Sequence, residues 1–154
     1  GSEGETEAVG RALAALAPPG TVVALRGELA SGKTCLVRGM AARFAPGAPV
    51  HSPTFTLVNQ YGTDHALYHL DLYRLSSPGE VADLGYEELF DSSGVCAVEW
   101  AERAEPLLPA ARVDITLAHA GGDLRDLEIR DSGVLPEGWA DALRAALGAC
   151  RERV

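Results

Sequence analysis

Residues 27–34 have the sequence Gly-Glu-Leu-Ala-Ser-Gly-Lys-Thr, an uninterrupted G-x-x-x-x-G-K-T motif. Successive backbone N–H groups of such a loop surround the β-phosphate of a nucleotide, and the helix after the loop points its N-terminus at the same charge. The side chain of Lys33 reaches the β- and γ-phosphates, and the hydroxyl of Thr34 is placed to bind Mg²⁺. The motif therefore predicts a strand, a phosphate-binding loop and a helix, in that order.

The residues on both sides of the loop agree with this prediction. Residues 21–25 are rich in β-branched side chains, and residues 35–44 place apolar side chains at helical spacing. Lys33 is the only lysine among the 13 lysine and arginine residues of the chain. A compact ammonium group contacts phosphate differently from a planar guanidinium, so this single lysine favours a phosphate site over an ordinary glycine-rich turn.

The composition is typical of a globular protein with a single domain, which we expect to span residues 3–154. The chain has 154 residues, of which 47% are hydrophobic and 23% charged. Gly1 and Ser2 resemble a remnant of an expression vector and are left out of the predicted fold. No apolar run approaches the roughly 18 residues of a membrane-spanning helix, and no signal peptide is recognisable.

Charge and cysteine content exclude several other classes of protein. The formal net charge is −9 and no basic patch is present, which argues against tight nucleic-acid binding by this chain alone. The three cysteines, Cys35, Cys96 and Cys150, are an odd number without C-x-x-C spacing. They are typical of reduced thiols in a cytoplasmic protein rather than of a disulfide framework or a zinc site.

The pattern of apolar and turn residues predicts a mixed sheet. Two β-rich runs, residues 52–61 and 67–73, are joined by a short polar turn and predict an antiparallel hairpin. A continuous apolar run over residues 94–99 predicts a buried central strand. Residues 113–117 and 127–129 alternate between apolar and polar, which predicts a second hairpin with one solvent-exposed face. We therefore expect an α/β fold of the P-loop NTPase type, a three-layer sandwich with a mixed parallel/antiparallel sheet.

Three further helices are predicted from their caps and apolar spacing. Thr6 is the expected N-cap of a first helix. Ser77 begins a short helix in the middle of the chain, and Pro136 lies in the first turn of the last helix. The expected buried faces comprise Val9, Leu13 and Leu16 in the first helix and Trp139, Leu143 and Leu147 in the last.

A nucleotide bound with Mg²⁺ needs an acid on a neighbouring strand to hold the metal or its water. Glu99 is the first candidate because it ends the predicted central strand. The alternative is that Glu99 has no role at a metal and is a solvent-exposed carboxylate at the end of a strand. Asp71 is the second candidate, since the two-residue period of a strand places it on one face with His69 and Tyr73. An ion pair with an arginine such as Arg74 is the structural alternative for Asp71.

Three other features suggest roles around a nucleotide. Ser52-Pro53-Thr54 lies one helix beyond the phosphate loop, where P-loop proteins often keep a nucleotide-sensing threonine in a mobile switch. Trp100 either stacks on a base or anchors a partner, unless it is a core residue. A further alternative is a metal site formed by four residues of the first hairpin, namely Asp64, His65, His69 and Asp71.

Several stretches taken together resemble the bacterial TsaE (YjeE) family. This family is the P-loop ATPase of the machinery that makes N6-threonylcarbamoyladenosine at position 37 of tRNAs that read ANN codons. The resembling stretches are GELASGKTCLVRG (27–39), HSPTFTLVNQY (51–61), YHLDLYRL (68–75), DLGYEELF (83–90) and VCAVEWAER (95–103). The combination of S-P-T-F-T-L-V, H-x-D-x-Y-R-L and E-W carries the resemblance, because the loop alone indicates only a P-loop NTPase.

The resemblance implies ATP as the nucleotide and Mg²⁺ as the metal. The residues it assigns to ATP are Glu28, Leu29, Ala30, Ser31, Gly32, Lys33, Thr34 and Cys35, together with Thr54 and Trp100. Thr34, Glu99 and Asp71 would hold Mg²⁺, and Asp71 and Glu99 would be the catalytic residues that organise the attacking water. Cys35 stands where the family commonly has a second threonine, so a hydroxyl contact to the α-phosphate is expected to be weak or lost.

The resemblance also implies partner proteins. The family's ATPase acts with a sugar-kinase-like catalytic subunit, which transfers the threonylcarbamoyl group, and with that subunit's inactive paralogue; it meets tRNA only through their complex. No arginine finger is evident in the sequence, so we expect the chain alone to hydrolyse ATP slowly and its partners to stimulate it. Two alternatives stay open: a small-molecule P-loop kinase, and a nucleotide-binding regulatory module without hydrolysis.

Overall fold

The computed structural model of the chain describes residues 2–53, 57–63, 65–83, 85–90 and 93–151. Its elements follow one another in the order α1 (Glu3–Leu16), β1 (Val22–Arg26), α2 (Lys33–Phe44), β2 (Val58–Tyr61), β3 (Leu67–Asp71), α3 (Pro78–Ala82), α4 (Tyr86–Phe90), β4 (Val95–Glu99), η1 (Ala101–Leu107), β5 (Val113–His119), β6 (Arg125–Asp131) and α5 (Trp139–Arg151). The η1 segment is a 3₁₀ helix that the sequence pattern did not predict.

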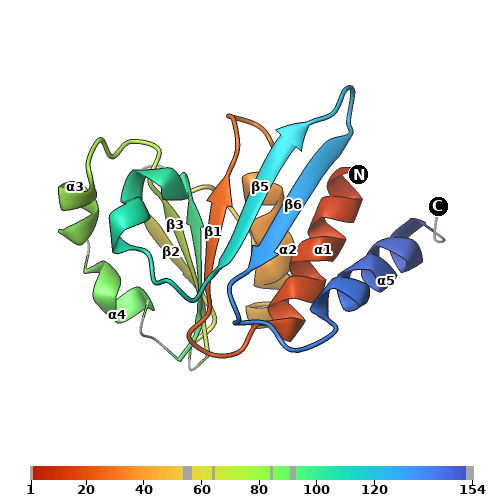
Figure 1. Cartoon of the computed structure of the whole chain (residues 1–154), viewed down its shortest axis with the longest axis horizontal. Helices are drawn as coiled ribbons and strands as arrows, with labels where there is room; N and C mark the ends of the chain where they lie inside the picture. The colour runs from red at the N-terminus through yellow and green to blue at the C-terminus, as the bar shows by residue number, and fades with distance from the viewer. Residues whose placement is uncertain (1, 54–56, 64, 84, 91–92, 152–154) are drawn as a thin grey trace.

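The six strands form one mixed sheet in the order β2-β3-β4-β1-β5-β6 (Figure 1). Strands β3, β4, β1 and β5 run parallel, whereas β2 pairs with β3 and β6 pairs with β5 in antiparallel fashion. The predicted mixed sheet and both predicted hairpins are therefore confirmed. The first strand of the first hairpin is shorter than predicted, because Leu57 has a positive φ of 67° that no extended strand can include.

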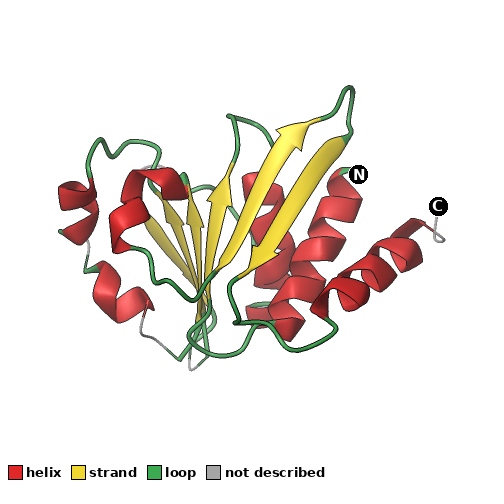
Figure 2. Cartoon of the chain, viewed as in Figure 1, coloured by secondary structure: helices red, strands yellow, loops and turns green. Residues whose placement is uncertain are grey.

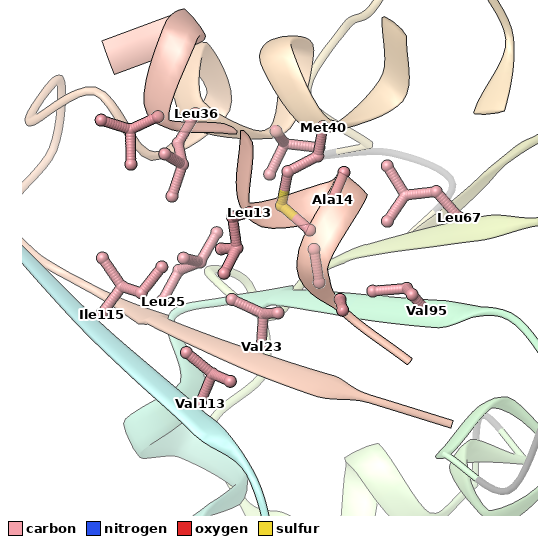
Figure 3. Close-up of a cluster of buried hydrophobic side chains, with 14 of the residues drawn as sticks. Leu13, Ala14, Val23, Leu25, Leu36, Met40, Leu67, Val95, Val113 and Ile115 are labelled. Atoms are coloured by element: carbon pink, nitrogen blue, oxygen red, sulfur yellow. The ribbon is translucent and has the colours of Figure 1, made fainter. Parts of the chain in front are cut away.

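Helices cover both faces of the parallel part of the sheet (Figure 2). In β1, Val23 and Leu25 pack into one cluster with α1 and α2 (Figure 3), whereas Val22 and Ala24 pack into a second cluster with α3, α4 and η1. Every residue of β4 is buried, as expected of a central strand. This burial on two sides agrees with the predicted three layers.

Helix α1 lies directly against α2 because a glycine of each helix faces the backbone of the other. A Cβ atom on Gly10 would lie 2.2 Å from Leu36 O, and a Cβ atom on Gly39 would lie 2.1 Å from Glu7 O. Only a residue without a side chain fits at such distances. The close approach brings the two first turns together, and Arg38 of α2 donates to Glu7 Oε1 at 3.0 Å.

The start of α1 differs from the prediction. The N-cap is Ser2: its Oγ accepts a hydrogen bond from the Glu5 N–H at 3.3 Å, and Glu5 Oε2 accepts one from the Ser2 N–H at 2.6 Å. This arrangement is a Ser-x-x-Glu capping box, so the prediction that Thr6 caps the helix is wrong. Thr6 lies buried in the first turn and donates to Ser2 O at 3.0 Å. Excluding Ser2 from the fold is wrong for the same reason.

The other predicted helices are present. Ser77 caps α3, and its Oγ accepts from the Glu80 N–H at 3.4 Å. The last helix, α5, begins at Trp139, so Pro136 precedes the helix instead of lying in its first turn. Leu143 is buried, while Trp139 and Leu147 are partly buried against the same cluster. Among the described residues, no helix has both the length and the apolar character needed to cross a membrane.

Two of the three cysteines are buried free thiols, Cys35 and Cys96. The Cys150 side chain lies outside the described part of the chain. Burial raises the pKa of Cys96, and burial together with nearby acids of α1 raises the pKa of Cys35 to about 11. Both thiols are therefore protonated at neutral pH and unreactive, in agreement with the predicted reduced state.

Candidate functional site

The candidate site lies at the carboxyl ends of β1, β3 and β4, which run parallel and therefore end at the same edge of the sheet. Leu25 of β1 pairs in register with Glu99 of β4, and Glu99 pairs in register with Asp71 of β3. A cleft of about 450 Å³ opens at this edge; residues 29–35, Ser52 and both acids line it. The fold thus brings the two predicted acids and the phosphate loop into one site.

The backbone of the loop has the shape that an anion requires. Gly27 and Gly32 have φ angles of 148° and 107°, and Ala30 has a φ of 61°, which is rare for a residue with a side chain. Left-handed residues in such a loop turn successive N–H groups toward one point. Ser31 Oγ is buried and, within the described residues, has no hydrogen-bond partner, which leaves this polar atom available to a ligand.

Helix α2 begins without a side-chain cap from the part of the chain that the structure describes. Its N-cap residue is Gly32, no side chain of the described residues bonds to its first N–H groups, and its first turn contains no acid. Uncapped N–H groups at a helix start carry partial positive charge and bind anions. The loop and the helix start together therefore have the geometry that a bound phosphate group requires.

Lys33 is buried in the cleft and held by the loop. Its Nζ donates to Gly27 O at 2.6 Å and to Glu28 O at 2.9 Å, and it lies 4.2 Å from the centroid of a Trp100 ring. Burial lowers the pKa of Lys33, although Glu99 and other nearby carboxylates act in the opposite direction. The ammonium group is thus held beside the loop by contacts within the chain.

Glu99 lies beside the first turn of α2. Its Oε1 accepts a hydrogen bond from Thr34 Oγ1 at 2.7 Å. His69 is fully buried, and its Nε2 lies 3.3 Å from the same oxygen, close enough for an electrostatic contact but without hydrogen-bond geometry. Glu99 is only 3% exposed, so the alternative of a solvent-exposed strand-end carboxylate is wrong.

Asp71 is the second acid of the cleft, and two neighbours fix its orientation. Its Oδ2 accepts from Ser52 Oγ at 2.5 Å, and its Oδ1 accepts from the Tyr73 N–H at 2.9 Å. Asp71 is 4% exposed, whereas Tyr73 is 43% exposed at the mouth of the cleft. The contact with Ser52 links the acid to the segment in which the sequence predicts a switch.

Trp100 lines the cleft beside Lys33 and also packs against the second hydrophobic cluster. The ring is half-buried, its centroid lies 5.0 Å from that of Tyr73, and the Cζ atom of Arg103 lies 5.7 Å from it. The backbone of Trp100 is left-handed, with φ of 58°, where β4 turns into η1.

The residues present fit a nucleotide with Mg²⁺. Hard cations prefer oxygen ligands, and Thr34, Glu99 and Asp71 supply hydroxyl and carboxylate oxygens to one cleft. The described residues contain no group of three or more His, Cys, Asp or Glu that could hold a metal. A magnesium ion here would therefore depend on phosphate oxygens for the rest of its shell, as is usual for Mg²⁺.

The alternative metal site of the first hairpin does not form among the described residues. His65 packs its ring against Phe44, and its Nδ1 lies 2.7 Å from Ser93 O, before β3 begins. Asp71 lies at the opposite end of β3. Asp64 lies outside the described residues.

The structure places most of the predicted nucleotide-binding residues on the cleft. Residues 29–35 and Trp100 line it, whereas Glu28 contributes its carbonyl oxygen to Lys33 and keeps its side chain exposed. Thr54 lies outside the described residues. Tyr73, which the strand period placed on one face with Asp71, also lines the cleft, and three further lining residues were missed in the sequence, Glu3, Arg38 and Arg125. No local pattern marks them, because helix packing and strand pairing bring them to the loop.

A G-x-x-x-x-G-K-T loop between a parallel strand and a helix, with carboxylates at the ends of adjacent strands, defines an α/β protein of the P-loop NTPase class. Residues 1–127 match the family described as "Threonylcarbamoyl adenosine biosynthesis protein TsaE". The chain belongs to the TsaE family, which confirms the resemblance found in the sequence.

Individual relatives agree with this assignment. The tRNA threonylcarbamoyladenosine biosynthesis protein TsaE of Bacillus subtilis (strain 168) is 42% identical over 124 residues, which cover 80% of this chain and 77% of the relative. The protein of the same description from Treponema pallidum (strain Nichols) is 38% identical, with 81% and 93% covered. The crystal structure of Bacillus subtilis YdiB superimposes with a TM-score of 0.73 at 31% identity, covering 99% of this chain and 91% of that one.

Proposed function

We propose that this chain is an Mg²⁺-dependent ATPase required for threonylcarbamoyl modification of adenosine 37 in tRNAs that read ANN codons. The observation that carries the proposal is the meeting of Lys33, Thr34 and the buried acids Asp71 and Glu99 in one cleft. The pathway is supported by family membership and by the descriptions of the relatives. We expect this step in the cytoplasm, and a single domain that includes Ser2 in addition to the residues 3–154 predicted from the sequence.

Residues 28–35 and Trp100 would bind the nucleotide, and the N–H groups of the loop and of the first turn of α2 would hold its phosphates. Lys33 Nζ already lies in the cleft on two loop carbonyls, so a change of partners from carbonyl to phosphate oxygen needs only a side-chain movement. Its burial strengthens the attraction, because an ion pair is screened less away from water. Thr54 would sense the nucleotide from the switch segment.

Thr34, Glu99 and Asp71 would hold Mg²⁺, which when bound neutralises charge on the phosphates. The hydrogen bond from Thr34 to Glu99 orients the hydroxyl beside the carboxylate. The hydrogen bonds from Ser52 and from the Tyr73 N–H hold the Asp71 carboxylate in one orientation. A carboxylate fixed in this way can accept a hydrogen bond from the attacking water and direct it toward the γ-phosphate.

The chain alone is expected to hydrolyse ATP slowly. Arg103 donates to Leu75 O, and Arg38 pairs with Glu3 and Glu7, so both guanidinium groups have partners within the chain. A positive charge supplied by a partner would accelerate hydrolysis by about 10³–10⁵-fold. We propose the threonylcarbamoyl-transferase catalytic subunit and its inactive paralogue as the partners. Contact with tRNA would be indirect, in keeping with the net charge of −9.

An ATP-consumption assay in three parallel arms tests this proposal: the chain alone, the chain with a panel of small phosphoacceptors, and the chain with both partners and tRNA. We expect slow hydrolysis alone and stimulation only in the third arm. Transfer of phosphate to an acceptor would instead identify a small-molecule kinase. Saturable ATP binding without hydrolysis in any arm would identify a regulatory module.

A further inference from the structure

We propose that Arg125 binds the phosphates of the nucleotide from the side of the cleft opposite the acids. The proposal rests on the proposed function, because it needs a nucleotide in this cleft. It adds a residue of β6 to a site otherwise built from the loop, α2, β3 and β4. Figure 1 shows the β5–β6 hairpin extending past the carboxyl end of β1, beside the connection from β1 to α2.

The hairpin fixes the position of the Arg125 side chain. Arg125 is the first residue of β6 and pairs in register with His119, the last residue of β5. Its Nη1 donates to Asp123 O in the turn at 2.9 Å. A Cβ atom on Gly32 would lie 3.0 Å from both Cδ and Nε of Arg125, so the side chain lies directly against the N-cap of α2. Both residues line the cleft.

The side chain of Arg125 adds positive charge to a helix start that is itself positive. The first N–H groups of a helix carry partial positive charge, and a cation near them is destabilised. The first turn of α2 contains no acid and begins with Lys33, so Arg125 adds a second cationic side chain to a positive helix end. A phosphate group between them would interact favourably with the N–H groups, the ammonium and the guanidinium at once.

The strand order shows which part of the nucleotide Arg125 would contact. Strands β3 and β4, which carry Asp71 and Glu99, lie on one side of β1, and β5 and β6 lie on the other. The metal and the terminal phosphate belong with the acids, so Arg125 lies on the side of the phosphates nearer the nucleoside. Cys35 also lines the cleft but is a weak donor whose thiol already donates to Glu3 O at 3.3 Å. The guanidinium is the stronger donor for a phosphate there.

Isothermal titration calorimetry with ATP, ADP and inorganic tripolyphosphate, each with Mg²⁺, tests the proposal on the full chain. Arg125→Ala is expected to weaken binding of all three ligands by roughly 10- to 100-fold, the value of a hydrogen bond to a charged group. Arg130→Ala is the matched control, because Arg130 lies on the same strand, pairs with Glu128 and has a side chain 77% exposed. It removes the same charge and is expected to change affinity by about twofold or less.

Three results would overturn the proposal. In the first, Arg125→Ala binds all three ligands as tightly as Arg130→Ala does. In the second, Arg125→Ala loses affinity for ATP and ADP but not for tripolyphosphate, which would mean that Arg125 contacts the nucleoside instead. If circular dichroism shows that Arg125→Ala does not fold, Arg125→Lys replaces it in the test, because lysine keeps the charge but lacks the planar fork of the guanidinium. We expect Arg125→Lys to bind the three ligands with intermediate affinity. Wild-type affinity for all three ligands would contradict the proposal. Failure of the wild-type chain to bind ATP would overturn the proposed function itself.

Discussion

Helices α1 and α2 pack side by side, yet their first turns satisfy the same requirement in opposite ways. Every α-helix begins with N–H groups that have no partner inside the helix. In α1, Ser2 and Glu5 form a capping box, and Glu3 adds a second acid to the first turn. In α2, the N-cap is Gly32, the first residue is Lys33, and the first turn contains no acid.

The two helix starts therefore differ in the role we propose for them: the α1 start stabilises the helix, and the α2 start binds a ligand. The cap of α1 is complete within the chain, because the Ser2 hydroxyl and the Glu5 carboxylate satisfy free N–H groups. The start of α2 combines a positive helix end with a buried lysine whose pKa is lowered by burial. Such an arrangement brings positive charges together, and a bound phosphate would compensate them, which is what a binding site requires.

Among the substitutions that test this comparison, Lys33→Ala should change ATP affinity the most. We expect Lys33→Ala to weaken ATP binding by about 100-fold or more, since a charge-assisted contact to phosphate is lost. The empty protein should unfold at the same or a higher temperature, because a buried cation at a helix N-terminus is removed. Calorimetric titration and circular dichroism melting measure the two effects.

The control for this variant is Arg43→Ala, which removes the cation in the last turn of α2. A cation at that end is favourable, so we expect a loss of about 0.3–1 kcal/mol in stability and unchanged ATP affinity. Normal ATP binding by Lys33→Ala would contradict the account of the α2 start.

Substitutions of the two acids of the cleft should affect ATP hydrolysis much more than ATP binding. Glu99→Gln and Asp71→Asn keep the shape of each side chain but remove its charge, so we expect partner-stimulated hydrolysis to fall by about 100-fold or more. ATP affinity should change much less, because the loop and α2 hold the phosphates. Single-turnover hydrolysis and calorimetry give the two quantities, with exposed Glu137→Gln as the control. Undiminished hydrolysis in both acid variants would remove the roles proposed for them.

Two glycine substitutions compare the helix starts directly. Gly32 has a φ of 107° and lies against Arg125, so Gly32→Ala should cost about 1–2 kcal/mol of stability and also impair ATP binding. Gly4, in the first turn of α1, has open space where a Cβ atom would lie. Gly4→Ala should therefore stabilise the protein by about 0.5–1 kcal/mol and leave ATP affinity unchanged. Urea unfolding measures both; equal effects of the two substitutions would contradict the comparison.

The smallest expected effect is the pH dependence of stability and of thiol reactivity that Cys35 contributes. Burial, with Glu7 and Glu3, raises its pKa from 9.0 to about 11. Because the folded-state pKa lies above the unfolded one, the thiol contributes stability that is fully present below pH 9.0 and is lost as the pH rises toward about 11. Alkylation by iodoacetamide should be slow at neutral pH, accelerate over this range, and slow further with bound ATP.

Mass spectrometry of the alkylated protein follows this reaction, and fully buried Cys96 provides an internal reference. Rapid alkylation of Cys35 at neutral pH would show that the first turn of α2 is more open than the structure indicates.

Local sequence patterns predicted the parts of the site that depend on short segments. The loop, the flanking strand and helix, and the acid at the end of a continuous apolar run are encoded within a few residues, and Glu99 was found in this way. The α1 cap was also readable from Ser2 and Glu5, but the sequence interpretation excluded Ser2 and chose Thr6.

Contacts between distant segments could not be predicted from those patterns. The register that sets Asp71 beside Glu99 depends on how β3 pairs with β4, which the composition of either strand does not determine. Arg125 reaches Gly32 only because β6 folds back along β5 beside the loop. The zero exposure of His69 likewise follows from the packing of the sheet rather than from its neighbours in the chain.

The central claim is that the first turn of α2 binds nucleotide phosphates whereas the first turn of α1 does not. A titration of ¹⁵N-labelled protein with ATP and Mg²⁺, followed by amide chemical shifts, tests it directly. We predict saturable changes that are largest at residues 28–35, with little change at the Glu5 N–H, which already bonds to Ser2 Oγ. Absence of saturable changes at residues 28–35, or equally large changes at Glu5, would contradict the claim.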